Sequence, residues 1–439
     1  MLTIIIVVLT VCLIAAIMLE RNLYCPAVVF DGVWLVVTVL YSLRLYNLYA
    51  VSERTLYYVL LGLLAFNGGF LLGRFMQPIR FSGIQVGHAS VHSSFGRLDV
   101  NYKLLDPLYF AILLFTAYLS KSSIRLLLSG TSMEVIRFNY ANLENGMVIR
   151  SALAWRFEMY VVSAFEFAAV ALLPVVMFQK KTKENIILTA ELILFLILHM
   201  FVTGARSFLI DIVILFAIYM LMNFEIVKRK FIKPKKIPKK VIFLFAVGAV
   251  LLVIVMTVLR KGNKRDSSLL REIYRYFAIS YPLFDRHLRI SEHLPHTHGW
   301  ELIYGLVRPP FSMLRSIGLN FPEGLNEAMI QINANDDFYQ VGGGQSNSFV
   351  TVFYYHYMDF GVISLVLYSL LYGFVSQVVY NTMKRNTHNL RAQTFYLIIA
   401  IGLFLTFARS LFAAYRYVYA LMVLAVAFRR PRRVEIPFV

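Results

Sequence analysis

The stretch IILTAELILFLILHMFVTGARSFLIDIVILFAIYMLM, Ile186–Met222, decides the fold class. It holds two apolar runs, each of about 17–20 residues, which is the length that crosses a bilayer as a helix. Arg206 stands at the junction of these runs, and Asp211 stands just inside the second run. A charge in hydrocarbon would be costly at such positions. The pattern therefore predicts two spans joined by a tight turn at Gly204, with Asp211 as a counter-charge for Arg206.

Composition extends this interpretation to the whole chain. The 439 residues are 59% hydrophobic and 15% charged, whereas a soluble protein carries about 25% charged residues. Lipid-exposed backbone must be helical unless it closes into a barrel, so we expect an all-α polytopic membrane protein, a single membrane domain over residues 1–439. The apolar blocks predict about eleven spans, between ten and twelve. These are 2–19, 26–43, 55–73, 104–120, 157–178, 185–202, 207–224, 241–259, 361–380, 393–408 and 411–427.

Basic loops set the predicted orientation. The strongest is VKRKFIKPKKIPKK, residues 227–240, and the loops after Phe178 and Thr382 and the C-terminal tail fall on the same side. That side is cytoplasmic by the positive-inside rule, which puts the N-terminus outside. Anchoring beside anionic lipid accounts for the net charge of +19, so nucleic-acid binding is not required. Two segments then face outward: 121–156 and the larger 260–360.

The outward side has its own charge pattern. Its basic residues are mostly arginines, and the lysines there are Lys121, Lys261 and Lys264. Arginine presents a rigid fork that binds phosphate through two hydrogen bonds, whereas lysine acts as a point charge. The bias favours an anionic ligand such as a diphosphate. Ordinary pairing with lipid phosphates and acidic side chains is the alternative for any single arginine.

The large outer segment carries the residues suited to chemistry. SLLREIYRYFAISY, residues 268–281, predicts an amphipathic helix at the membrane surface. HLPHTHGWELIYGLVRPPF, residues 293–311, contains three histidines, whose near-neutral pKa suits a general base or acid. A solvated polar loop is the plain alternative for each histidine, and the cluster lacks partners at metal-ligand spacing. Phosphate-loop, serine-elbow and zinc-protease motifs are absent from the sequence.

Three segments carry a family resemblance: NLYCPAVVFDGVWLVVTVLYSLRLY (residues 22–46), TGARSFL (203–209) and SNSFVTVFYYHYMDFGVISL (346–365). With many spans and one large late loop, the chain resembles the bacterial oligosaccharide repeat-unit polymerases, the Wzy-type O-antigen polymerases, along most of its length. The resemblance implies a GT-C-like membrane glycosyltransferase related to the O-antigen ligases. It would act on undecaprenyl-diphosphate-linked saccharides without metal or other cofactor, in the bacterial inner membrane with its active site facing the periplasm. Its partners would be these lipid-linked donor and acceptor saccharides, membrane lipid and a chain-length regulator, with no nucleic acid.

The implied chemistry assigns roles to residues. A diphosphate leaving group needs fixed positive charge, and the acceptor hydroxyl must lose a proton. We assign diphosphate binding to Arg206, Arg409, Arg416, Arg275 and Arg286. The expected base is His296 or His298, with Asp359 in reserve, and sugar would be held by Trp300, Asn347, Tyr354 and Tyr355.

Two other functions stay open on the sequence. An O-antigen ligase would use the same chemistry with another acceptor. A transporter or flippase of lipid-linked saccharide would favour internal repeats with broken helices in both halves, which the sequence does not display.

Overall fold

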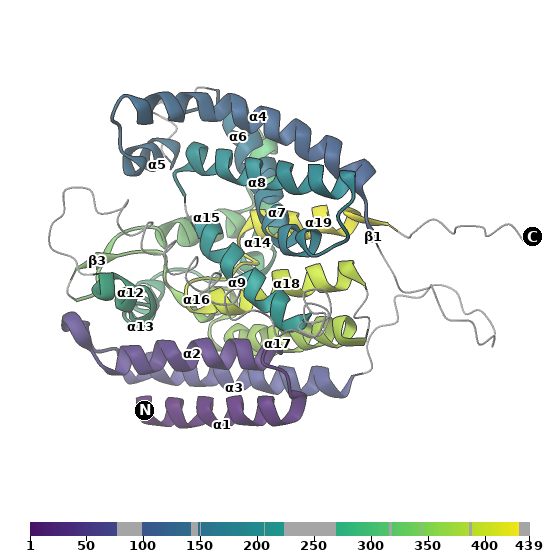
Figure 1. Ribbon diagram of the computed structural model, residues 1–439. Helices are drawn as coiled ribbons and strands as arrows, with labels where there is room; N and C mark the ends of the chain where they lie inside the picture. Colours follow the sequence, from purple (N-terminus) through teal and green to yellow (C-terminus); the bar gives the residue numbers. More distant parts are fainter. Residues whose placement is uncertain are drawn as a thin grey trace, which may run out of the picture. The chain divides into compact units, whose positions relative to one another are not determined.

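The computed structural model describes residues 1–76, 99–141, 148–149, 151–205, 207–223, 269–315, 318–342, 344–385 and 389–429. Figure 1 shows helices throughout, with strands only as two-residue segments. Seven of the described helices are long and apolar enough to cross a membrane: Leu2–Glu20, Glu53–Phe75, Tyr102–Leu128, Ala152–Met177, Lys183–Thr203, Val362–Arg385 and Leu390–Phe407. The predicted all-α polytopic membrane protein is confirmed.

Three shorter apolar helices, Pro26–Ser42, Phe208–Met222 and Tyr415–Val426, coincide with three more of the expected spans. The expected span 241–259 lies outside the described residues.

The chain divides into two compact units, each assembled from separate stretches. Unit 1 comprises Met1–Phe75, Leu209–Gln377 and Ile399–Val418, and unit 2 comprises Met76–Phe208, Val378–Ile398 and Tyr419–Val439. Most of the outer segment 260–360 therefore belongs to unit 1, together with the first three helices.

Unit 1 contains α1 (Leu2–Glu20), α2 (Pro26–Ser42), η1 (Leu45–Asn47), α3 (Glu53–Phe75), most of α9 (Ser207–Met222), α12 (Leu269–Ala278), α13 (Ser280–Ser291), α14 (Trp300–Arg315), α15 (Glu323–Ala334), β2 (Tyr339–Gln340), β3 (Gln345–Ser346), α16 (Thr351–Phe360) and η5 (Leu405–Phe407). Unit 2 contains α4 (Tyr102–Leu128), α5 (Met133–Ala141), α6 (Ala152–Phe157), the π-helix η4 (Glu158–Val162), α7 (Ser163–Met177), α8 (Lys183–Thr203), β1 (Asp99–Val100) and β4 (Phe428–Arg429). α17 (Val362–Arg385), α18 (Leu390–Phe404) and α19 (Tyr415–Val426) contribute to both.

In unit 1, α3 and α17 approach each other backbone to backbone. A Cβ added at Gly69 would lie 1.9 Å from the carbonyl oxygen of Leu370, and one at Gly373 would lie 2.1 Å from that of Phe66. Only glycine permits this spacing, which is how small residues let membrane helices pack closely.

The helix ends of unit 1 form two groups, each of which joins ends that the predicted spans place on one side of the membrane. At the end of α1, Glu20 accepts a hydrogen bond from Gln377 at 3.2 Å and lies 3.6 Å from Arg74. These contacts bring together the ends of α1, α3 and α17 that are predicted to face inward. At the opposite end of α3, Asp285 of α13 accepts from the backbone N–H of Ser52 at 2.9 Å and from the Thr55 hydroxyl at 2.6 Å. Asp285 belongs to the segment 260–360 that is predicted to face outward, and Thr55 begins the span predicted over 55–73.

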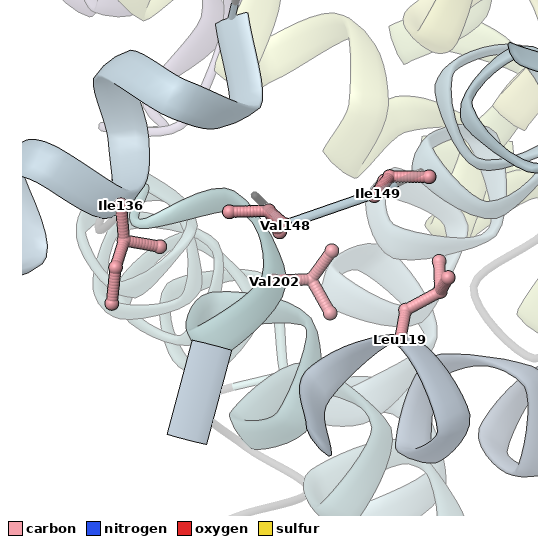
Figure 2. Close-up of a cluster of buried hydrophobic side chains, with 5 residues drawn as sticks. All are labelled: Leu119, Ile136, Val148, Ile149 and Val202. Atoms are coloured by element: carbon pink, nitrogen blue, oxygen red, sulfur yellow. The ribbon is translucent and has the colours of Figure 1, made fainter. Parts of the chain in front are cut away.

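Unit 2 is built on α4 packed against α8. Figure 2 shows Leu119 of α4, Ile136 of α5 and Val202 of α8 gathered around Val148 and Ile149, all nearly without solvent exposure. This apolar cluster holds the short helix α5 and the 148–149 segment onto the two long helices.

Unit 2 also buries a group of ionisable side chains. His199 of α8 lies 2.8 Å from Glu158 through Nε2 and 3.3 Å from Glu166 through Nδ1, and the Tyr140 hydroxyl donates to Glu158. The exposed fractions of His199, Glu158 and Glu166 are 1%, 0% and 5%. Glu158 opens the π-helical turn, a local widening that re-aims side chains inside an otherwise regular helix. This arrangement ties α8 to the helix formed by α6, η4 and α7.

Candidate functional site

The predicted catalytic residues meet where α16 ends beside the start of α14. The Asp359 carboxylate is fully buried and accepts a hydrogen bond from the Thr297 hydroxyl. It also accepts from the backbone N–H groups of Glu301 at 3.0 Å and Leu302 at 3.3 Å. These N–H groups belong to the first turn of α14 and lack partners within that helix. Asp359 is thus an N-terminal cap supplied from a distant part of the chain.

His296 lies on the exposed side of the same junction. Its Nδ1 is 3.2 Å from the backbone carbonyl oxygen of Met358. A carbonyl only accepts, so Nδ1 carries the proton and Nε2 presents a lone pair. Nε2 would lie 3.6 Å from a Cβ at Gly361, whose φ of +64° itself favours glycine. The imidazole is therefore oriented to take a proton at Nε2.

His298 is also exposed, but a different contact holds it. Its backbone N–H donates to the carbonyl oxygen of Asp359 at 3.2 Å, and its ring centroid lies 5.9 Å from that of Phe360. The backbone of His298 has φ of +52°, a left-handed conformation that turns the chain into α14. Both predicted histidines are thus brought to the Asp359 junction.

Arg54 also contacts this junction, although the sequence did not single it out as a site residue. It donates to the Tyr357 hydroxyl at 3.1 Å and forms an ion pair with Glu292. These partners stand 303 and 238 positions away along the chain. In the sequence, Arg54 is only an arginine beside the start of a predicted span, and such arginines are common in membrane proteins.

Two of the predicted diphosphate ligands are brought to one hairpin, formed by β2 and β3. Arg275 donates to the backbone carbonyl oxygen of Gln345 at 2.9 Å, and the Arg286 guanidinium carbon lies 5.8 Å from the ring centroid of Tyr339. Gly344 lies directly against the Arg275 guanidinium, since an added Cβ would stand 2.9 Å from its Nη1. Arg286 is exposed and Arg275 is half-buried.

The other predicted arginines lie elsewhere. A spacing of seven places Arg409 and Arg416 on one helical face only if the helix is continuous, and residues 408–414 are not helical. The chain leaves the helix after η5 and resumes only at Tyr415, so this condition is not met. Arg409 lies near Tyr355, whose pKa burial raises while the charge of Arg409 opposes the rise. Arg206 lies outside the described residues.

The four residues predicted to hold sugar have mixed surroundings. Tyr354 and Tyr355 are 1% and 5% exposed. Trp300 is partly exposed and packs onto Gly324 and Phe311. The side-chain amide of Asn347 donates to the backbone carbonyl oxygen of Asp336 at 2.7 Å.

Burial shapes the electrostatics of the junction. Burial, followed by the charge of Asp359, raises the pKa of Glu301 well above its ordinary value, which favours the protonated acid. Burial and the neighbouring Arg286 lower the pKa of His287 to about 4, and none of the described residues forms a hydrogen bond with its Nε2. His287 stands between Tyr339 and Tyr354 as a neutral ring.

Within the described part of the chain, no group of three or more His, Cys, Asp and Glu side chains has a geometry that could hold a metal ion.

Comparison with known proteins gives one match. A family model described as "O-antigen polysaccharide polymerase Wzy" matches residues 108–429, most of the chain. Neither the curated proteins nor the solved structures contain a match to the chain.

Proposed function

Because the chain belongs to the Wzy family of O-antigen polysaccharide polymerases, we propose that it is a membrane glycosyltransferase that joins lipid-linked oligosaccharide repeat units. The family match confirms the resemblance that the sequence indicated and identifies a multi-pass membrane protein of polysaccharide biosynthesis.

The proposed donor is the growing glycan on undecaprenyl diphosphate, and the proposed acceptor is the terminal sugar of a new lipid-linked repeat unit. The acceptor hydroxyl oxygen attacks the anomeric carbon of the donor and forms the new glycosidic bond. The bond from that carbon to the diphosphate oxygen breaks, and the lipid diphosphate leaves with the electron pair. The hydroxyl proton passes to the enzyme's base, and no metal, nucleotide sugar or other cofactor takes part in the proposed reaction.

One observation carries the assignment of that base: the Nδ1 of the exposed His296 faces the Met358 carbonyl, which leaves Nε2 as the proton acceptor. A base of this kind contributes about 10²–10⁴-fold to a rate. Asp359 was the reserve candidate. Its carboxylate already accepts three hydrogen bonds in a buried position, so we assign it to positioning the segment that bears His296 and His298.

We assign the leaving diphosphate to Arg275 and Arg286, which the β2–β3 hairpin brings together, with Arg206, Arg409 and Arg416 as further ligands. Fixed guanidinium groups stabilise the charge that develops as the glycosidic bond breaks.

Trp300 and Asn347 would contact sugar at the surface. The buried Tyr354 and Tyr355 would support that surface from beneath.

The proposed setting is the bacterial inner membrane, with this site facing the periplasm, where the lipid-linked saccharides and a chain-length regulator would meet it. The helix ends of unit 1 support this, since the Asp359 junction and the Ser52–Asp285 contact belong to segments that basic-loop asymmetry places outward.

The test is a reaction of the purified full-length protein with lipid-linked repeat units. We expect a ladder of longer glycans that persists with chelator. His296→Gln should form it about 10²–10⁴-fold more slowly. His293→Gln is the matched control, because it changes an exposed histidine three positions away, and it should form the ladder at the wild-type rate.

A His296→Gln protein at full rate would exclude His296 as the base, and a ladder abolished by chelator would exclude a metal-free reaction. In cells, deletion should remove long chains but retain one repeat unit. Loss of that single unit as well would indicate a ligase.

A further inference from the structure

Three aromatic rings stand in a row beside the proposed base. The rings of Tyr58 and Tyr357 are stacked, with centroids 5.6 Å apart and planes 29° apart, and the ring of His296 follows at 6.0 Å from that of Tyr357. Tyr357 in the middle is buried, whereas Tyr58 is half-buried and His296 is exposed. The row thus ends at the surface with His296.

Arg54 forms hydrogen bonds with the hydroxyl groups of both tyrosines in this row. It donates from Nε to the Tyr58 hydroxyl and from Nη2 to the Tyr357 hydroxyl, both at 3.1 Å, and forms the ion pair with Glu292. The side chains of Arg54 and Glu292 remain 40% and 44% exposed. An ion pair this exposed contributes little to folding stability, so stability alone is a weak reason for the arrangement.

Together these side chains offer what a sugar ring requires. Aromatic faces cover the apolar C–H face of a pyranose, and a few placed polar groups fix its hydroxyls. The guanidinium supplies donors and the carboxylate supplies acceptors, both at the edge of the stacked rings.

From this placement we propose that Arg54, Tyr58, Glu292 and Tyr357 form a saccharide subsite that holds the terminal sugar of the acceptor repeat unit beside Nε2 of His296. The proposal rests on the proposed function, because it takes His296 as the group that deprotonates the acceptor hydroxyl.

Charge distinguishes this subsite from one for the donor diphosphate. Glu292 already pairs with Arg54, so a diphosphate would have to displace a carboxylate, whereas a neutral sugar hydroxyl adds to the pair without breaking it.

Binding is tested with the full-length protein in detergent and the host's own repeat-unit oligosaccharide, freed of lipid by mild acid. Saturation-transfer NMR titration gives the dissociation constant. Tyr58→Leu and Arg54→Lys should each weaken binding about tenfold, the loss expected for one stacking or one bidentate contact. Arg74→Lys, at the other end of α3 beside Glu20, is the matched control and should bind as the wild type does.

Kinetics separate this proposal from the proposed function. Tyr58→Leu and Arg54→Lys should raise the KM for acceptor about tenfold and leave kcat within about twofold. His296→Gln should lower kcat and keep the oligosaccharide affinity. Wild-type affinity and KM in both subsite variants would overturn the subsite, whatever His296 does. Unchanged kcat in His296→Gln would overturn the base and leave the binding result standing.

Tyr58→Phe guards against a folding defect, because it keeps the stacked ring and removes only the hydroxyl that Arg54 reaches. Its affinity should lie between those of the wild type and Tyr58→Leu. If Tyr58→Phe and Arg54→Lys both bind as tightly as the wild type, the subsite is rejected even where Tyr58→Leu does not fold.

Discussion

Asp359 and Glu301 are joined across 58 positions of the chain by a 3.0 Å hydrogen bond from the backbone N–H of Glu301 to the Asp359 carboxylate. The contact makes the last buried residue of α16 the cap of α14. It therefore fixes the turn that carries His296 and His298.

The first prediction separates a cap from a base at position 359. Asp359→Ala removes the acceptor for the first turn of α14 and should lower the free energy of unfolding by about 1–2 kcal/mol. Asp359→Asn keeps one acceptor oxygen and should retain most of both stability and turnover. Thermal unfolding in detergent and ladder formation measure the two effects. Equal inactivity of both variants at wild-type stability would make Asp359 the base.

The second prediction concerns the contact between Gly344 and Arg275. Gly344→Ala places a Cβ 2.9 Å from the Arg275 Nη1 at φ of +145°, so the guanidinium must move. We expect a stability loss of about 1–3 kcal/mol and weaker binding of inorganic pyrophosphate, measured by calorimetry. Gly130→Ala is the control, because Gly130 has φ of +89° but open space around it, so only strain is added. Equal pyrophosphate affinity in both variants would remove Arg275 from the anion site.

The third prediction is a pH dependence from His287. Its pKa is lowered from 6.5 to about 4 by burial and by Arg286, so the unfolded chain binds the proton more tightly. The stability contributed by the neutral ring is complete above pH 6.5 and is lost as the pH falls toward 4, by about 3 kcal/mol in all. His287→Phe should therefore show a smaller fall in Tm between pH 7 and pH 4.5 than the wild type. An identical fall in both proteins would contradict the assignment.

The fourth prediction addresses the buried His199 cluster. His199→Leu leaves the carboxyl groups of Glu158 and Glu166 without their imidazole partner and should cost about 3–5 kcal/mol of stability. Combining His199→Leu with Glu158→Gln and Glu166→Gln removes the ionisable groups together and should recover much of the loss. The Tm in detergent measures both proteins. No recovery in the combined variant would show that packing, and not charge, dominates at this position.

The spans could be predicted because each is a local property of the sequence. An apolar run such as Leu2–Glu20 has the right length and composition whatever surrounds it. The predicted spans 393–408 and 411–427 placed an interruption after residue 408, but the structure extends the non-helical segment to residue 414, through the apolar residues 411–414.

The candidate site was predictable in residue type but not in role. Sequence indicated that Asp359 and the histidines of 293–298 matter, yet a carboxylate that caps a helix and one that acts as a base look the same in a sequence. Arg54 could not be assigned at all, because its partner Glu292 is 238 positions away and neither residue stands in a distinctive motif. Contacts of this range depend on the folded arrangement of helices.

The glycine contact between α3 and α17 restricts how a lipid substrate reaches the site. Because Gly69 and Gly373 let the two backbones touch, a polyprenyl tail cannot pass between α3 and α17 at the level of these glycines. Arg54 is the second residue of α3 and Gly361 immediately precedes α17, so the contact between the two helices also fixes the distance between the helix ends beside the proposed subsite. Under the proposed function, the lipid tail of the substrate therefore enters along other helix faces, while its sugar binds at the fixed ends of these two helices.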